Sequence, residues 1–471
     1  MKTYQDWLKV ADGSESQRME FIKALIDEHK TSDIYQQAAD AENYFKGQNT
    51  TIKRYEKLLF NSNGQTVPDY FSANHKLANR FFYRDVTQAN STLLGNGISW
   101  KNGKGGKALG KDFDRKIIKA GRYAQTGGVS FGFYNNKKVV VYSVLEFAPL
   151  YDEEDGALKA GCRFWQIDNT KPLRATMMEL NGYTDYQWDK DHATGMVRTP
   201  KKSYKAVIQS SEAFGDEILR GENYPTFPVV PLWANESKQS ELLPLKATID
   251  CYDLINSGYA NNIDDASLIY WTITNAGGMD DVDLVQFLDK MRKLHAAQTD
   301  ADQQVQPTTV DVPFAGREAL LDRLERQMYR DAMALDTYTI ASGAITATQI
   351  QAAYEPLNEK LDAYEAEITD FIDRLLVVAG VEDEPTYTRS IIINKGEEVS
   401  IVLNSAQFTD PDYVTEKVLT ILGDKDNVNE ILKKRAATDM QRMTGGQPTE
   451  GNEGEEEPEE EEETGGVNAE A

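Results

Sequence analysis

The residues with the most suggestive chemistry form a glycine-rich loop at 105–112, Gly-Gly-Lys-Ala-Leu-Gly-Lys-Asp. The spacing matches GxxxxGK, in which backbone amides and a lysine cradle the phosphates of a nucleotide. Asp112, however, stands where a Ser or Thr should hold Mg²⁺, and its carboxylate would repel the phosphates. The apolar run before the loop, residues 98–100, is too short for the buried strand that such a loop follows. The sequence therefore favours a flexible basic loop, with a nucleotide-binding enzyme as the alternative.

Other groups that could do chemistry are clustered acids, histidines and cysteines. The acidic run at 152–155 lacks the alternating ligands and distal Glu of a calcium loop, which indicates a solvated turn. The four histidines have no metal-ligand spacing with the two cysteines, Cys162 and Cys251. No local pattern suggests a Ser-His-Asp or Cys-His pair. We therefore expect no catalytic residue, no metal and no cofactor, and so a protein that is not an enzyme.

The charge of the chain restricts how it could meet nucleic acid. The 471 residues carry a formal net charge of −25, to which the segment 447–471 contributes 11 acidic residues and no basic ones. The rest of the chain is therefore acidic as well. A protein that grips DNA neutralises phosphates with clusters of Lys and Arg. An acidic surface beside DNA suits a protein past which the DNA slides.

Composition also indicates the cellular environment in which the protein is made. Hydrophobic residues make up 40% of the chain, and no apolar run is long enough to span a bilayer. The first residues lack the apolar core of a secretory signal. The two cysteines are far apart in sequence and predict no disulfide framework. We expect a soluble protein without membrane contact, synthesised in a reducing cytoplasm.

The elements around which the chain is organised lie at 245–378. Two amphipathic helices, 245–263 and 317–336, bracket a compact insert. The insert is predicted to contain a strand at 267–274, a turn at Gly277 and Gly278, a helix at 282–297 capped by Asp280 and Asp281, and an extended run at 305–312.

A third, longer helix is predicted at 346–378, after a short polar loop at 337–345. Its apolar residues alternate at spacings of four and three, the pattern of a helix packed along one seam. They are Ile350, Tyr354, Leu357, Leu361, Tyr364, Ile368, Phe371 and Leu375. The helix would be roughly 50 Å long at about 1.5 Å per residue. Pro356 should kink it near its start.

The remaining segments predict a mixed α+β chain. Residues 1–60 have the pattern of polar helices, and a helix is predicted at 73–94. Residues 98–230 turn to strands, with a hairpin turn at Asn135 and Asn136. Further predictions are strands at 162–167, 204–208, 390–394 and 399–403, helices at 413–422 and 428–443, and disorder at 444–471.

Three stretches resemble the portal proteins of tailed double-stranded DNA phages, in the group found in long-tailed phages of Gram-positive hosts. Residues 74–82 lead to a Leu-Leu-Gly turn at 93–95, where Gly97 replaces the proline of the family's Leu-Leu-Gly-x-Pro-Ile turn. The proline-rich run 227–233, followed by 242–253, resembles the family's entry into its first stem helix. The third likeness is the order helix, small α/β insert, helix, loop and long kinked helix. Together these stretches cover about residues 69–410.

The resemblance implies an α+β portal fold that forms a ring, usually of about twelve subunits, at one vertex of a capsid. Residues 1–244 would form N-terminal helices and an α/β wing, 245–263 and 317–336 two stem helices, and 264–316 a small α/β clip. Residues 337–345 would be a tunnel loop, 346–408 the long wing helix with returning strands, 409–445 a helical crown, and 446–471 a disordered acidic tail.

The resemblance also implies site residues. The tunnel loop would line the narrowest part of a DNA channel with Thr337, Tyr338, Thr339, Ile340, Ala341, Ser342, Gly343, Ala344 and Ile345. Mixed charges on the second stem helix suit salt bridges between subunits. They are Arg317, Arg323, Arg326, Arg330, Asp322 and Glu325. The clip would dock a packaging motor and later an adaptor, through Trp271, Asp280, Asp281, Phe287 and Arg292.

The implied function is a non-enzymatic conduit for double-stranded DNA in the virion. A terminase large subunit would package DNA through the ring, and a head-tail adaptor would later bind it. Major capsid and scaffolding proteins would be further partners. Two alternatives stand beside this function. One is a nucleotide-binding enzyme that uses the loop at 105–112, and the other is a structural ring protein without a DNA channel.

Overall fold

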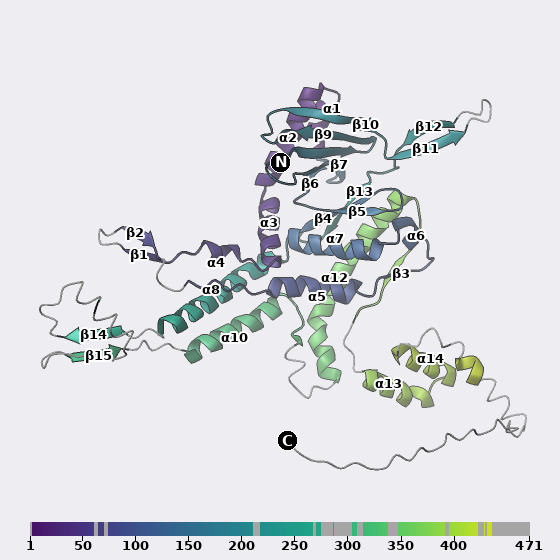
Figure 1. Cartoon of the computed structure of the whole chain (residues 1–471). Coiled ribbons are helices and arrows are strands. Elements are labelled where there is room, and N and C mark those ends of the chain that lie inside the picture. Colours follow the sequence, from purple (N-terminus) through teal and green to yellow (C-terminus); the bar gives the residue numbers. More distant parts are fainter. Residues whose placement is uncertain are drawn as a thin grey trace, which may run out of the picture. The chain divides into compact units, whose positions relative to one another are not determined.

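The structure is a computed structural model (Figure 1). It describes residues 2–60, 65–69, 74–210, 217–266, 270–274, 286, 304–308, 314–337, 347–390, 395–422, 428 and 431–435. The chain divides into two compact units, Met1–Ile391 and Ile392–Ala471, which we describe separately. Both helices and strands are present, which confirms the mixed α and β class predicted from the sequence.

Four helices open the chain: α1 (Tyr4–Ala11), α2 (Glu15–Thr31), α3 (Asp33–Phe45) and α4 (Thr50–Arg54). Thr3 and Ser14 each form a capping box, which satisfies the first free amides of α1 and α2. The helical prediction for residues 1–60 is confirmed, apart from β1 (Leu58–Phe60), which pairs with β2 (Thr66–Pro68).

The helices α1 and α2 cover an antiparallel sheet of five strands in the order β10-β9-β8-β7-β6. These strands are β6 (Phe147–Tyr151), β7 (Leu158–Trp165), β8 (Leu173–Glu179), β9 (Gly182–Trp188) and β10 (Gly195–Lys202). Trp7 and Ile22 are buried with Cys162 and Met177 in the core between helices and sheet. The hairpin β11 (Lys205–Ser210) and β12 (Glu217–Glu222) follows, so the strands predicted at 162–167 and 204–208 are confirmed with shifted ends.

A three-stranded sheet in the order β13-β4-β5 lies in the largest core. Its strands are β4 (Val129–Tyr134), β5 (Val139–Ser143) and β13 (Val229–Trp233). The predicted hairpin is confirmed, with a turn in which Asn136 and Lys137 adopt φ angles of 43° and 64°. Asn tolerates this left-handed conformation better than most residues.

Helices cover this central sheet. They are α7 (Phe113–Gly127) and the long α12 (Ala347–Ala379), and α5 (Phe81–Leu94) packs against both of them. The short α6 (Gly105–Leu109) packs against α12, and α12 crosses α5 and α7 in Figure 1. Every residue of β4 is buried, and a Cβ on Gly132 would meet the Phe371 ring of α12 at 2.5 Å. The apolar seam predicted from the four-three spacing is confirmed, since Leu357, Leu361 and Ile368 are buried in this core.

The paired helices α8 (Leu242–Ala266) and α10 (Phe314–Asp331) project from the body side by side (Figure 1). Between them along the chain, β14 (Tyr270–Thr274) pairs with β15 (Gln304–Thr308). The two helices and two extended runs predicted here are confirmed with shifted ends. The helix predicted at 282–297 and the turn at Gly277 and Gly278 lie outside the described residues, apart from helical Gln286.

The helix predicted at 73–94 is wrong in its first half, because residues 74–80 are extended and α5 begins at Phe81. The amides of His75, Leu77 and Asn79 donate to three α8 side chains, those of Asn261, Ser257 and Asp253, at 2.7, 2.9 and 2.9 Å. The amide of every second residue in this segment thus reaches a side chain on every fourth residue of α8. This long-range partner outweighs the local helical pattern.

The second unit contains α13 (Lys395–Asn404), a short 3-10 turn (Ser405–Gln407) and α14 (Pro411–Leu422). The strand predicted at 399–403 is therefore wrong. Its β-branched run Ile401-Val402 has strand propensity, but the segment is helical and packs against α14. The helix predicted at 413–422 is confirmed. Ser390 is not in a strand, and residues 391–394, 423–427 and 436–471 lie outside the described residues.

Candidate functional site

The projecting pair of helices is anchored to the body by an apolar cluster. Leu245 and Ile249 of α8 and Met328 of α10 are each at most 2% exposed. They pack with Phe82 and Val86 of α5 in one core. The far ends of the helices meet through polar contacts instead, because Tyr259 donates to Glu318 at 3.5 Å and packs edge-on to Phe314. The pair therefore has a fixed root and a more polar outer half.

A ladder of polar side chains ties α8 to the N-terminal helices and to residues 74–80. The carboxylate of Asp253 is fully buried and accepts from Asn49 at 2.8 Å and from the Asn79 amide side chain at 2.7 Å. Burial raises the pKa of Asp253, while the hydrogen bonds from Asn49 and Asn79 oppose that shift. One turn before Asp253 on α8, Asp250 forms an ion pair with Lys246 at 3.0 Å. These bonds fix the root of α8 in both position and rotation.

The charged residues of α10 form two separate stripes. Arg323, Arg326 and Arg330 are exposed, and their spacing of three and four places them on one face. That face points away from the buried Met328. No ion pair joins these arginines to another described residue. The second stripe comprises Glu318, Asp322 and Glu325. Arg317, unlike the three exposed arginines, has a partner on α8. Its guanidinium donates to the side-chain oxygen of Asn262 when that amide is oriented with its oxygen toward Arg317.

The chain after α10 is clamped just before the predicted tunnel loop. The side chain of Gln88 on α5 accepts from the Leu335 amide at 2.9 Å and donates to the Leu335 carbonyl at 3.0 Å. Lys360 on α12 donates to the carbonyl of Ala332 at 3.0 Å. Two helices therefore hold the entry to this loop. Thr337 is exposed, and the other predicted loop residues, Tyr338 to Ile345, lie outside the described residues.

Lys360 belongs to a buried ionic cluster. Its ammonium lies 3.0 Å from Asp85 and 3.4 Å from Glu241, and the Asp85 side chain is 1% exposed. Burial alone would lower the pKa of Lys360, but the attraction of both carboxylates outweighs it, so that the pKa is raised. The charged lysine thus joins α12, α5, the start of α8 and the end of α10 at one point.

Of the five predicted clip residues, the structure describes only Trp271. Trp271 lies in β14 opposite Pro307 of β15. Asp280, Asp281, Phe287 and Arg292 lie outside the described residues.

The acidic run at 152–155 is a turn, as predicted, in which Asp155 pairs with Lys159 at 2.8 Å. Within the described part of the chain, no group of three or more His, Cys, Asp or Glu is arranged to hold a metal ion.

The glycine-rich loop at 105–112 does not have the geometry of a phosphate site. Residues Gly105–Leu109 are helical, and the amides of Asn102, Lys104 and Gly105 donate to the carboxylate of Asp383 at 2.7 to 2.8 Å. Desolvation opposes ionisation of Asp383, but these backbone bonds outweigh it and lower its pKa to about 2. Of these three residues only Gly105 belongs to the loop. Within the loop, the amides of Ala108 and Gly110 donate to the carbonyls of Lys104 and Gly106, so they are not available to cradle a phosphate. Asp383 joins β3 (Ile98–Trp100) and β16 (Pro385–Tyr387) to α6.

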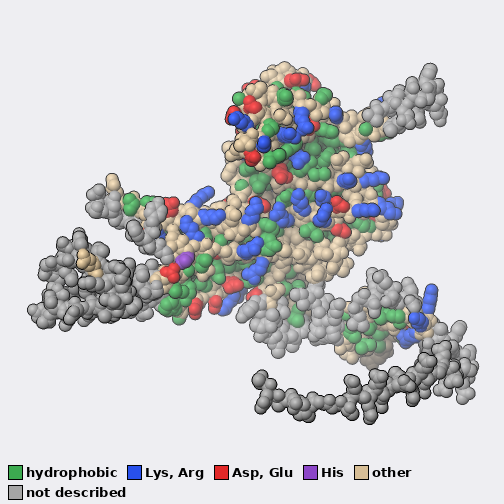
Figure 2. Space-filling model, in the orientation of Figure 1, with side chains coloured by type: hydrophobic (Ala, Val, Ile, Leu, Met, Phe, Trp, Pro, Cys, Tyr) green, Lys and Arg blue, Asp and Glu red, His purple; other side chains and the backbone are tan. Residues whose placement is uncertain are grey.

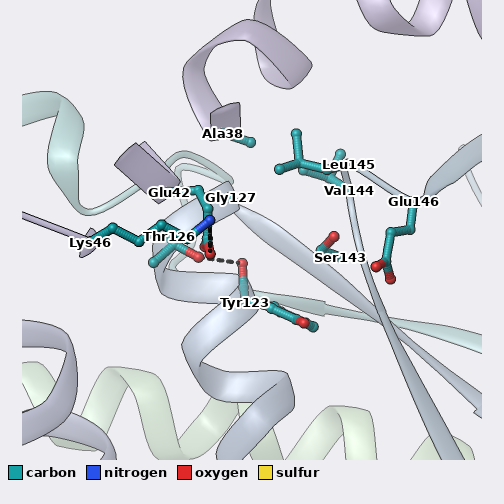
Figure 3. Close-up of a pocket in the computed structure, with 10 residues that line it drawn as sticks. All are labelled: Ala38, Glu42, Lys46, Tyr123, Thr126, Gly127, Ser143, Val144, Leu145 and Glu146. Atoms are coloured by element: carbon teal, nitrogen blue, oxygen red, sulfur yellow. Dashed lines mark hydrogen bonds and ion pairs between the residues drawn. The ribbon is translucent and has the colours of Figure 1, made fainter. Parts of the chain in front are cut away.

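A small cavity lies between α3, α7 and β5 (Figure 3). Its volume of about 180 Å³ is below the usual range for small-molecule sites. The charged side chains that line it are Glu42, Lys46 and Glu146, and Glu42 pairs with Lys46 at 3.3 Å. No histidine or cysteine lines it. In the described part of the chain, none of the helices has both the length and the apolarity to cross a membrane.

Sequence reasoning missed the residues that hold the site together. Gln88, Asp253 and Lys360 are polar residues on helices, and the sequence pattern alone gives each the appearance of a solvent-facing position. Only Lys360 carried a signal. It directly precedes the seam residue Leu361 and, at helical spacing, lies one turn after Pro356, beside the predicted apolar stripe.

Comparison with known families places this arrangement among the portal proteins of phages. The family described as "Phage portal protein, SPP1 Gp6-like" matches residues 23–441, which is most of the chain, and the chain belongs to this family. The portal protein of Clostridium phage phiCD119 is 27% identical over 203 residues, which cover 40% of this chain and 44% of that relative.

Two further comparisons cover more of the chain. The portal protein of Bacillus phage SPP1 is 20% identical over 372 residues, which cover 74% of this chain and 69% of that protein. Among solved structures, a chain in the virion of a native gene transfer agent particle is 11% identical. Its TM-score is 0.43, and the match covers 73% of this chain and 89% of that one.

Proposed function

We propose that this portal protein forms a closed ring of about twelve subunits, through which double-stranded DNA is packaged and later ejected. The observation that carries the proposal is the pair of charge stripes on α10. Arg323, Arg326 and Arg330 are exposed and have no ionic partner among the described residues, while an acidic stripe lies on the neighbouring face. Stripes of opposite sign on one helix can pair between neighbouring copies in a ring.

In this proposal α8 and α10 are the stem helices, and residues 264–316 form the clip. Residues 337–345 form the tunnel loop, at the narrowest part of the channel. Gln88 and Lys360 fix the chain where this loop begins, so the loop can touch passing DNA while its root stays in place. The body up to residue 244 and α12 form the wing, and residues 409–445 form the crown.

The net charge of −25 suits a conduit, because acidic walls repel phosphates and do not hold DNA in place. The proposed partners are a terminase large subunit and later a head-tail adaptor at the clip, with capsid and scaffolding proteins around the wing. ATP hydrolysis belongs to the terminase in this scheme. The nucleotide-binding alternative is not favoured, because residues 105–109 are helical and the amides of Ala108 and Gly110 donate within that helical turn.

A charge-swap experiment tests the proposed interface. One variant carries Arg323→Glu, Arg326→Glu and Arg330→Glu, and a second carries Glu318→Arg, Asp322→Arg and Glu325→Arg. Each alone brings like charges together between neighbouring copies and should lower ring occupancy in sedimentation velocity at least tenfold. An equimolar mixture should restore rings, because each interface of an alternating ring again joins opposite charges.

The matched control carries Arg198→Glu, Arg220→Glu and Lys190→Glu, three exposed residues of the sheet-rich body. It has the same change in net charge as the arginine variant and should form rings normally. If the arginine variant also forms rings, or if mixing does not restore them, the stripes do not form the interface. In the first case, a defect limited to DNA passage would place the arginines on the channel wall instead.

A further inference from the structure

One part of this acidic protein is strongly basic. Residues 101–138 contain ten Lys and Arg against two Asp, in a chain whose net charge is −25. Seven of these lysines are exposed, and one of them, Lys101, pairs with Glu384. We call the other six the lysine surface: Lys104, Lys107, Lys111, Lys119, Lys137 and Lys138. Figure 2 shows basic side chains gathered over α6 and α7.

The fold brings the lysine surface together from separate segments. Gly110, with a φ of 99°, lies so close to the β4–β5 turn that a Cβ there would meet the carbonyl oxygen of Lys137 at 2.5 Å. The hydroxyl of Tyr134 donates to the carbonyl of Ala108 at 3.2 Å and fixes the same approach. Lys111 after α6 and the lysines of the turn are therefore neighbours.

A further lysine is held beside this turn. The amide of Asn136 donates to the hydroxyl of Tyr224 at 2.8 Å, and the ammonium of Lys205 lies 4.2 Å from the centre of the Tyr224 ring. Glu222 is the residue opposite Lys205 in the β11–β12 hairpin. The basic area thus extends from α7 across the turn to the start of β11.

Four carboxylates near these lysines are already engaged, while Asp373 and Glu382 line one pocket with Lys104. Asp383 accepts from backbone amides, and Glu384 pairs with Lys101 at 2.7 Å. Asp114 accepts from the amide of Ile98 at 3.2 Å, and Asp112 lies 3.7 Å from Arg115. None of the six lysines forms an ion pair with another residue in the described ranges. Lysines gathered without ion pairs repel one another, and an external polyanion would relieve that repulsion.

The chemistry of this surface favours phosphate over an acidic protein as that polyanion. Protein interfaces centre on apolar or aromatic anchors, yet Ile118 is the one large exposed apolar side chain found between residues 101 and 138. Lysine ammonium groups on flexible stems bind phosphates as point charges, without base readout. Nucleic acid binding through such contacts is independent of sequence.

We propose that the lysine surface binds the phosphate backbone of duplex DNA, as a second DNA contact separate from the channel. This goes beyond the proposed conduit, because α6, α7 and the β4–β5 turn belong to the wing and not to α8 or α10. A duplex could then lie against the wing while another part of the same DNA occupies the channel. The contact is weak, electrostatic and insensitive to sequence.

Closed circular DNA separates this contact from the channel, because a circle has no end that can thread a ring. The full chain is titrated with a labelled, relaxed, covalently closed duplex circle at 50 to 250 mM KCl, and binding is measured by filter retention. With about six phosphate contacts, the logarithm of the affinity should fall with the logarithm of salt at a slope of about −5.

The test variant carries Lys107→Gln, Lys111→Gln and Lys138→Gln. Its affinity at 0.1 M salt should fall on the order of 100-fold, and its slope should become shallower by about 3. The matched control carries Lys171→Gln, Lys190→Gln and Lys202→Gln, three exposed lysines outside the surface, and should bind as the unchanged protein does. Thermal unfolding and ring occupancy of both variants verify that they fold and assemble.

Two results would overturn the proposal. In the first, the test variant binds the circle with unchanged affinity and slope. In the second, the unchanged protein does not bind the circle at 50 mM KCl but binds poly-L-glutamate through these lysines, which would assign the surface to an acidic polypeptide. Either result leaves the channel proposal intact. Conversely, if the charge swaps on α10 show no interface while circle binding depends on these lysines, the wing contact stands alone.

Discussion

Replacing Lys360 by Met should destabilise the first unit by about 3–5 kcal/mol, the usual cost of removing one partner from a buried ion pair. The ammonium donates to both oxygens of Asp85, at 3.0 and 3.2 Å, and lies 3.4 Å from Glu241. The side chain of Asp85 is 1% exposed, so water cannot take the place of the ammonium. Met has a similar length and preserves packing, so the loss is mainly electrostatic.

The companion substitutions isolate the ionic contribution. Asp85→Asn should cost less, about 1–3 kcal/mol, because Lys360 keeps Glu241 and the carbonyl of Ala332 as partners. The double variant Lys360→Met with Asp85→Asn removes both charges. It should be more stable than the sum of the two single changes predicts, by at least about 1 kcal/mol.

The assay is urea unfolding followed by tryptophan fluorescence, with hydrogen exchange of residues 328–337 as the local readout. Exchange there should accelerate in Lys360→Met, because the carbonyl of Ala332 loses its donor. The control is Arg374→Met, which removes a pair with Asp370 whose side chains are 57% and 50% exposed. It should cost less than about 0.5 kcal/mol. Costs below about 1 kcal/mol for Lys360→Met, with additive double changes, would refute the idea that this cluster holds the joint.

Three further outcomes are expected. Asp383 has a pKa of about 2, below the ordinary 3.8, so its stabilisation is present above about pH 4 and is lost as the pH falls toward 2. The difference in unfolding midpoint between the unchanged protein and Asp383→Asn should therefore shrink over that range, and a difference independent of pH would contradict this. Gly110→Ala should destabilise by about 2–4 kcal/mol in urea unfolding, because its φ is 99° and a Cβ would meet a backbone oxygen at 2.5 Å. Its counterpart Gly258→Ala, in open space on α8, should stabilise by up to about 1 kcal/mol, and equal effects would be incompatible with the geometry. Asp253→Ala should lower the free energy of unfolding by about 2–3 kcal/mol in the same assay, because it leaves the donors of Asn49 and Asn79 without an acceptor. Unchanged hydrogen exchange at the Asn79 amide would exclude that role.

The sequence predicted those elements whose local pattern and packing agree. The seam of α12 has an unbroken four-three spacing, and the hairpin at Asn135 and Asn136 has turn residues between two apolar runs. In both cases the pattern reports directly which residues are buried or turned. The order of the described helices and strands between 245 and 378 was predictable for the same reason.

The failures occur where a distant partner decides the local structure. Residues 74–80 have a helical pattern, but hydrogen bonds to α8, more than 170 residues away, hold them extended. At 399–403, strand propensity is outweighed by packing against α14. The clamp by Gln88 and Lys360 could not be predicted either, because polar residues on helices normally face solvent and nothing local indicates a buried partner.

Electron microscopy of the purified full chain tests the central claim most directly. The account predicts a closed ring of about twelve copies. Its central hole should be wide enough for duplex DNA, with the arginine face of α10 against the neighbouring copy and residues 337–345 at the narrowest point. A monomer or a small closed oligomer at high concentration would contradict the account, as would a ring in which α10 does not contact the next copy.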